Sequence, residues 1–204
     1  GSLDWSGLVH PYSTAAAESL WRGFHEEHRP VRPRPVPAER PRVSVCMPYF
    51  NHGRYLPEAL ASLAAQDYPD FDVVVVDDGS TDPDSAKVFE EMRAAYPAWT
   101  FVSGPRQGAR EARNEAVRRA TGDLVTFFDS DNVAEPYMLS CLVRGLLTSG
   151  RDCVACHYVA YADEPGMATS HIPMYGFFPL GSCPEYGFFF NVFGDTTCIL
   201  RRQT

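Results

Sequence analysis

From residue 43 onward, short apolar runs alternate with stretches in which every third or fourth residue is apolar. Apolar runs of about four to eight residues are typical of buried strands, and the longer period is typical of amphipathic helices. The chain presents the two patterns in turn. The expected strands cover 43–48, 71–77, 99–102, 124–129 and 196–201, and the expected helices cover 55–66, 85–96, 107–120 and 136–148.

Strands that alternate with helices predict an α/β domain, in which a mostly parallel, Rossmann-like sheet carries helices on both faces. Residues 152–161 alternate like one further strand. Gly122 follows the helix expected over 107–120, and we expect it to be the C-terminal cap of that helix. Residues 162–195 are rich in glycine, proline and aromatic residues. Their aromatic rings could line a ligand cleft or form a satellite hydrophobic cluster on the sheet.

The first 42 residues differ in composition from the rest. Gly1 and Ser2 look like the remnant of a cleaved tag. The pattern of residues 13–28 predicts a short amphipathic helix, and we expect residues 1–28 to be the tail of an upstream domain. Residues 29–42 interleave arginine with proline, which excludes a helix or a central strand and predicts a stiff extended linker. The folded domain is expected to be 43–204, truncated at its C-terminus.

Charge and cysteine content exclude some classes of protein. The net charge of −8 argues against a nucleic-acid partner, since phosphate backbones attract basic surfaces. No apolar run is long enough to span a membrane, and no signal peptide is visible, so we expect a cytoplasmic protein with six free thiols. Cys153-Val-Ala-Cys156-His157 matches a haem-attachment pattern, but its strand-like surroundings favour small buried hydrophobic side chains.

Polar residues follow three of the expected strands, at the carboxyl ends where open parallel sheets bind their ligands. The three clusters are Pro48, Tyr49, Phe50 and Asn51; Asp77 and Asp78; and Asp129 and Asp131. No Gly-x-Gly-x-x-Gly turn follows the first strand and no Gly-Lys-Ser/Thr occurs, which argues against a Rossmann dehydrogenase and a P-loop enzyme.

Asp129 and Asp131 are two residues apart, and in an extended chain such side chains leave the same face. Hard divalent cations such as Mn²⁺ or Mg²⁺ prefer paired carboxylates of this kind and can bridge them to phosphates. The alternative is a solvated turn in which Asp129 or Ser130 caps the next helix.

Four segments occur in order and at characteristic spacing: Val43–Asn51, Val75–Asp82, Gly108–Asn114 and Thr121–Asp131. Together they resemble glycosyltransferase family 2, whose members have the GT-A fold, and the resemblance covers roughly 42–150. It implies transfer of a sugar from a nucleoside-diphosphate sugar, expected to be a UDP-sugar, with inversion at the sugar carbon. The acceptor, whether a glycan, a lipid or a small molecule, is not implied.

The resemblance also implies roles for individual residues. Pro48 and Phe50 would flank the nucleobase, Asp78 would accept hydrogen bonds from the base edge, and Asp131 would ligate Mn²⁺ or Mg²⁺ with Asp129 close by. Asn114 would pack beneath the metal-bearing strand. Eight residues are expected at the nucleotide: Pro48, Phe50, Asn51, Asp77, Asp78, Arg113, Asp129 and Ser130. For Asp77 a turn-stabilising role, and for Arg113 a salt bridge on the helix surface, are the alternatives.

The catalytic base is not found. In inverting members of the family a carboxylate deprotonates the acceptor hydroxyl, and it lies on a helix after the strand expected at 196–201. We therefore expect the base beyond Thr204, and we expect the 204-residue chain to transfer little sugar. Asp195 precedes that strand and is expected to be a loop acid.

Two other classes of protein remain as alternatives. The first is a non-catalytic nucleotide-sugar-binding or interaction module of a larger protein. The second is a sugar nucleotidyltransferase, which would need a glycine-rich loop with Arg or Lys that Tyr49–Arg54 does not supply.

Overall fold

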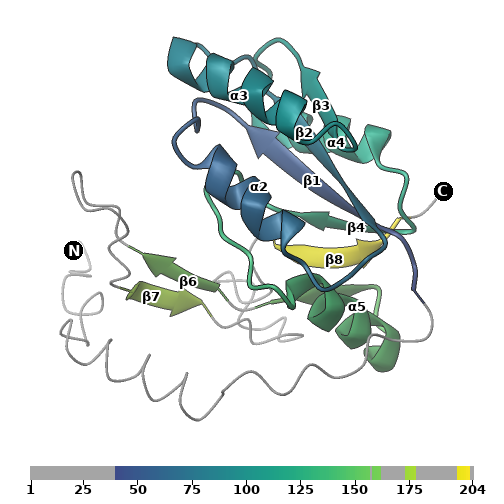
Figure 1. Cartoon of the computed structure of the whole chain (residues 1–204). Coiled ribbons are helices and arrows are strands. Elements are labelled where there is room, and N and C mark those ends of the chain that lie inside the picture. The colour runs from purple at the N-terminus through teal and green to yellow at the C-terminus, as the bar shows by residue number, and fades with distance from the viewer. Residues whose placement is uncertain (1–39, 157, 162–172, 178–196, 203–204) are drawn as a thin grey trace, which may run out of the picture.

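The computed structural model describes residues 40–156, 158–161, 173–177 and 197–202. From β1 to α5 the elements follow one another as the hydrophobic pattern predicts, whereas β7 lies in the stretch expected to be rich in loops (Figure 1). They are β1 (Val43–Tyr49), α2 (Leu56–Ala64), β2 (Phe71–Asp77), α3 (Pro83–Ala95), β3 (Thr100–Ser103), α4 (Ala109–Arg119), β4 (Leu124–Phe127), α5 (Met138–Ser149), β5 (Cys153–Ala155), β6 (Tyr158–Tyr161), β7 (Pro173–Phe177) and β8 (Cys198–Arg201).

The main sheet has six strands in the order β3-β2-β1-β4-β8-β5. β1 pairs in parallel with both β2 and β4, and β2 pairs in parallel with β3. β8 is antiparallel to β4 on one side and to β5 on the other, so it alone runs against the other strands of this sheet. Figure 1 shows β8, from the C-terminal end of the chain, lying directly beside β4. The sheet is therefore mostly parallel, as expected.

Helices cover both faces of the sheet because successive residues of each strand point to opposite sides. Val45 and Met47 of β1 belong to the larger core cluster, which includes buried residues of α2, α3 and α5. Cys46 belongs to a second cluster, in which α4 contributes the helical residues. Burial raises the pKa of the Cys46 thiol to about 12, which makes it an unreactive apolar side chain at neutral pH.

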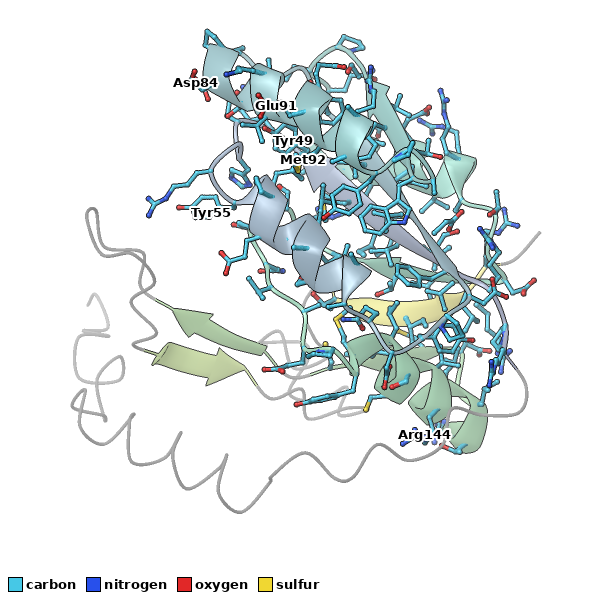
Figure 2. The ribbon with its side chains drawn as sticks, in the orientation of Figure 1. Tyr49, Tyr55, Asp84, Glu91, Met92 and Arg144 are labelled. Carbon is cyan, nitrogen blue, oxygen red and sulfur yellow. The ribbon has the colours of Figure 1, made fainter. Side chains whose placement is uncertain are left out.

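The end of β1 is fastened to the start of α3 by Tyr49. Its hydroxyl donates a hydrogen bond of 2.7 Å to the carbonyl oxygen of Ser85, and its ring stacks on Phe89 with 5.5 Å between the ring centroids. Figure 2 shows Tyr49 beneath α3, the helix that carries Met92. Burial raises the pKa of the Tyr49 phenol, so it stays a neutral donor. This contact fixes the carboxyl end of the central strand.

Two expectations about local structure are wrong. Residues 152–161 form not one strand but two, because β5 pairs with β8 in the main sheet, whereas β6 pairs with β7 in a separate two-stranded sheet. Gly122 is not the cap of α4, which ends at Arg119 with Ala120 as its C-cap. Gly122 is required for close packing instead, since a Cβ there would lie 2.7 Å from the carbonyl oxygen of Arg42 and 2.7 Å from the amide nitrogen of Ser44.

The five cysteines within the described ranges are free thiols, as expected, and Cys183 lies outside those ranges. His157 of the haem-like pattern also lies outside them, as do most of 162–195 and Asp195. In the described part of the chain, each helix is too short or too polar to cross a membrane.

Candidate functional site

The order of the strands reverses between β1 and β4. The chain runs from β1 to β2 to β3 in one direction, and α4 then carries it back to β4 on the other side of β1. In open α/β sheets the crevice at such a reversal, beyond the carboxyl ends of the strands, is where ligands bind. Tyr49 lies opposite Asp77, and the amide of Phe128 donates to the carbonyl of Cys46 at 3.1 Å. The three predicted polar clusters therefore meet at one edge of the sheet.

Asp77 is the last residue of β2 and Asp78 follows it, and both are almost buried, with exposures of 8% and 6%. Asp77 accepts hydrogen bonds from the amide and the hydroxyl of Ser80 at 2.9 and 2.6 Å, and these bonds brace the loop that follows β2. The Asp78 carboxylate accepts the amides of Gln107 at 2.7 Å and Gly108 at 2.9 Å. These bonds satisfy part of a buried carboxylate and fix the segment before α4 beside the end of β2.

Asn51 follows β1 with a φ of +54°, the left-handed conformation that side chains other than glycine rarely adopt. Its amide oxygen accepts the backbone amides of Thr81 at 2.8 Å and Asp82 at 3.0 Å, and its amide nitrogen donates to the hydroxyl of Thr81 at 3.0 Å. Asn51 thus joins the loop after β1 to the loop after β2. In this structure its side chain serves to position the Asp77–Asp82 loop.

Phe50 extends from the end of β1 and is only partly buried. The guanidinium carbon of Arg106 lies 3.9 Å from the centroid of the Phe50 ring, a cation–π contact. Pro48, the other residue expected to flank the base, is buried within β1. One aromatic face at this edge is therefore covered by an arginine from the loop between β3 and α4.

β4 ends at Phe127, two residues earlier than expected. Asp129 and Asp131 therefore do not share a face of an extended strand, contrary to expectation. Asp131 lies in the turn that follows, where the amide of Asn132 donates to the carbonyl of Asp129 at 3.1 Å. Asp129 accepts a hydrogen bond of 2.6 Å from the guanidinium of Arg113, and the two side chains are 29% and 24% exposed. Arg113 thus reaches the acidic turn rather than the helix surface.

The turn after β4 is held in place by the loop that follows β1. The Ser130 hydroxyl, 2% exposed, lies 3.0 Å from Nδ1 of His52, so this side chain anchors the turn. The side chain of Asp131 is exposed. Asn114 does not pack beneath β4 as expected, because it lies on the exposed side of α4 and its amide reaches Glu111 at 3.5 Å.

The carboxylates at this edge fit a divalent cation that is shared with a ligand. Among the described residues no group of three or more His, Cys, Asp or Glu side chains could hold a metal ion, so this part of the chain does not offer a complete cage. Mg²⁺, and Mn²⁺ with similar ligand chemistry, commonly bind through one or two carboxylates and take their remaining ligands from phosphates and water. Exposed Asp131 would be the main protein ligand, next to Asp129.

Sequence reasoning missed two residues that this edge depends on, His52 and Arg106. His52 lies inside the expected turn after the first strand, and nothing in its sequence context points to Ser130. Arg106 lies in an irregular segment where no periodicity applies. Both contacts arise only when loops from different strands are brought together, so a single sequence carries no local signal for them.

A mostly parallel α/β sheet with acidic loops at its topological reversal places the chain in the class of open α/β folds that bind ligands at that reversal. Comparison with known proteins specifies the family. The sequence model for glycosyl transferase family 2 matches residues 44–202. The chain belongs to this family, and its fold is the GT-A fold of glycosyltransferases.

Relatives and solved structures agree with this assignment. An N-acetylglucosaminyltransferase of Mesorhizobium japonicum is 41% identical over 105 residues, which are 50% of this chain and 25% of that protein. The glycosyltransferase GlyA of Streptococcus pneumoniae is 29% identical over 131 residues, 64% of this chain and 19% of that one. A mannosyltransferase of Pyrobaculum calidifontis, solved with GDP-Man and Mn²⁺, is 30% identical with a TM-score of 0.54 over 70% of this chain and 44% of that one. The chain thus spans less than half the length of these relatives.

Proposed function

We propose that this chain binds a nucleoside-diphosphate sugar together with Mn²⁺ or Mg²⁺, as the donor-binding part of an inverting glycosyltransferase. The observation that supports the proposal most directly is that Phe50, Asp78 and Asp131 follow three neighbouring strands at the carboxyl edge where the sheet reverses. A nucleotide laid across this edge would have its base at the ends of β1 and β2 and its diphosphate at the turn after β4.

Each end of the site offers chemistry suited to one part of the donor. The aromatic face of Phe50 suits a nucleobase, and the carboxylate of Asp78 has lone pairs beyond those used by the amides of Gln107 and Gly108 to accept a base N–H. Asp131 would hold the cation, and Arg113 would keep Asp129 in place. A bound cation would offset the negative charge that develops on the departing nucleoside diphosphate.

The identity of the nucleotide and the reaction are also part of the proposed function. The family resemblance favours uracil as the base, whereas the Pyrobaculum enzyme was solved with GDP-Man, so both diphosphates belong in the test. The acceptor and the donor sugar are left open. The residue that deprotonates the acceptor is not among the described residues in a recognisable position, and we expect the 204-residue chain to bind donor but transfer little sugar. Its location in the cytoplasm stays a prediction from the sequence.

The test is thermal unfolding of the chain with UDP or GDP, each with and without Mn²⁺. A ligand that binds only the folded state at about 100 times its Kd adds about 2.7 kcal/mol. In a protein of this size that raises Tm by about 5–10 °C. Asp131→Ala should lose the part of the shift that requires Mn²⁺ and keep the remainder.

The matched control is Asp152→Ala, which removes an exposed carboxylate just before β5, at the other edge of the sheet. It should leave the whole shift intact. Absence of any shift with both diphosphates in the presence of Mn²⁺ would overturn the donor-site assignment. Robust sugar transfer by the chain would instead show that the catalytic base has been missed, and binding without transfer also fits a module that only binds the donor.

A further inference from the structure

The contact between Arg106 and Phe50 is closer than an incidental approach of two side chains. With its guanidinium carbon 3.9 Å from the ring centroid, the arginine lies over the face of the ring at van der Waals distance. No flat group fits between them. Any nucleobase that is to stack on this face of Phe50 must first displace the guanidinium.

The backbone of Arg106 is held in place by the loop that carries Asp78. The next two residues, Gln107 and Gly108, donate their amides to the Asp78 carboxylate at 2.7 and 2.9 Å. Gly79, with a φ of +71°, lies so close that a Cβ there would be 2.8 Å from the amide nitrogen of Arg106. Since the backbone is fixed on this side, only the exposed side chain of Arg106 can move away from the ring.

We propose that Arg106 competes with the nucleobase of the donor for the face of Phe50, and so sets the affinity of the site for the base. This inference rests on the proposed function, because it takes Phe50 as the wall of the base subsite. The arginine side chain is a flexible competitor, and its backbone is held beside Asp78, the residue that would recognise the base edge. Arg106 thereby weakens base binding by a fixed factor without contacting the sugar.

The size of that factor follows from the two stacking contacts. Base-on-aromatic stacking is generally stronger than a cation–π contact at an exposed site, so the base can displace the guanidinium. Binding then occurs only to the fraction of molecules whose ring is open, and the apparent Kd rises by the inverse of that fraction. For an exposed arginine on a phenyl ring this corresponds to about two- to five-fold.

The experiment measures binding of a nucleoside, which carries no phosphate, so that loss of the arginine's charge does not alter a phosphate contact. Whichever of UDP and GDP raises the Tm of the wild-type chain with Mn²⁺ decides whether uridine or guanosine is used. Titration followed by NMR should show that Arg106→Ala binds the nucleoside about two- to five-fold more tightly than wild type. Arg106→Lys, which keeps the charge but loses the planar group, should gain less.

Two controls show whether the effect runs through the ring. Arg110→Ala removes an arginine in the first turn of α4 whose side chain is 87% exposed, and it should leave nucleoside affinity unchanged. In a Phe50→Leu background, Arg106→Ala should no longer change the affinity. Unchanged or weaker binding by Arg106→Ala overturns the inference, and so does a gain that persists without the Phe50 ring. A wild-type chain that binds neither diphosphate overturns the proposed function as well. A wild-type chain that binds a diphosphate while Arg106→Ala shows no gain overturns only the inference about Arg106.

Discussion

At the residue scale, Asn51 is the clearest case of a predicted site residue whose observed contacts are with the protein. Its left-handed backbone and its three hydrogen bonds hold the loops after β1 and β2 together. An alanine would lose these bonds and would also adopt a conformation that costs an L side chain about 1–2 kcal/mol. A glycine would lose the bonds only, since it accepts positive φ without strain.

We expect Asn51→Ala to lower the free energy of unfolding by about 2 kcal/mol and Asn51→Gly by about 1 kcal/mol. Urea unfolding followed by circular dichroism measures both values. Asn114→Ala is the control, because this exposed asparagine makes only a 3.5 Å contact and its loss should cost less than about 0.5 kcal/mol. Equal losses for the alanine and glycine variants would show that the positive φ carries no strain.

Single residues also illustrate how much of the candidate site the sequence could predict. It identified the carboxylates because Asp77, Asp78, Asp129 and Asp131 follow apolar runs directly, and strand ends in a parallel sheet share one edge. It did not separate residues that face the edge from those that brace it. That division depends on partners such as Ser80 and His52, which only the folded chain brings within hydrogen-bonding distance.

At the scale of elements, the apolar period located every helix and strand from β1 to α5, with ends shifted by one or two residues. It could not give the role of Gly122, because a glycine after a helix is commonly a cap. Here Thr121 and Gly122 instead donate their amides to the hydroxyl of Ser44 at 3.1 and 2.9 Å, and the glycine passes against the backbone at the start of β1. The turn from α4 into β4 is therefore fixed by backbone contact.

Gly122→Ala should be strongly destabilising, because the added methyl group would meet backbone atoms that cannot move separately. Besides the two contacts to Arg42 and Ser44, it would lie 2.9 Å from the carbonyl oxygen of Leu124. We expect a loss of about 3 kcal/mol, measured by urea unfolding. Gly104→Ala is the control, since a Cβ there would meet only the carbonyl oxygen of Asp77 at 3.9 Å, and it should be neutral or slightly stabilising. Similar values for both variants would contradict the packing role.

At the scale of the whole molecule, the sheet is completed by a strand that the local pattern detected but could not orient. Alternating strands and helices predict parallel neighbours, and nothing within 196–201 indicates that β8 runs antiparallel between β4 and β5. Its insertion makes β4 an internal strand, so the strand that leads to Asp129 and Asp131 is supported on both sides. Residues at the far end of the chain thus stabilise the candidate site without lining it.

Ile199 tests this arrangement because it is fully buried in β8, opposite Thr126 of β4. Ile199→Ala should cost about 2–5 kcal/mol in a single unfolding transition, since the cavity would lie in the core that β4 shares with α5. The exposed Val133, 60% accessible, gives the control Val133→Ala, which should cost less than about 0.5 kcal/mol. UDP or GDP with Mn²⁺ should still add the same stabilisation to the folded Ile199→Ala protein, because the residues at the carboxyl edge are unchanged. A separate low-temperature transition, or loss of nucleotide binding by the folded variant, would show that β8 and the site do not belong to one cooperative sheet.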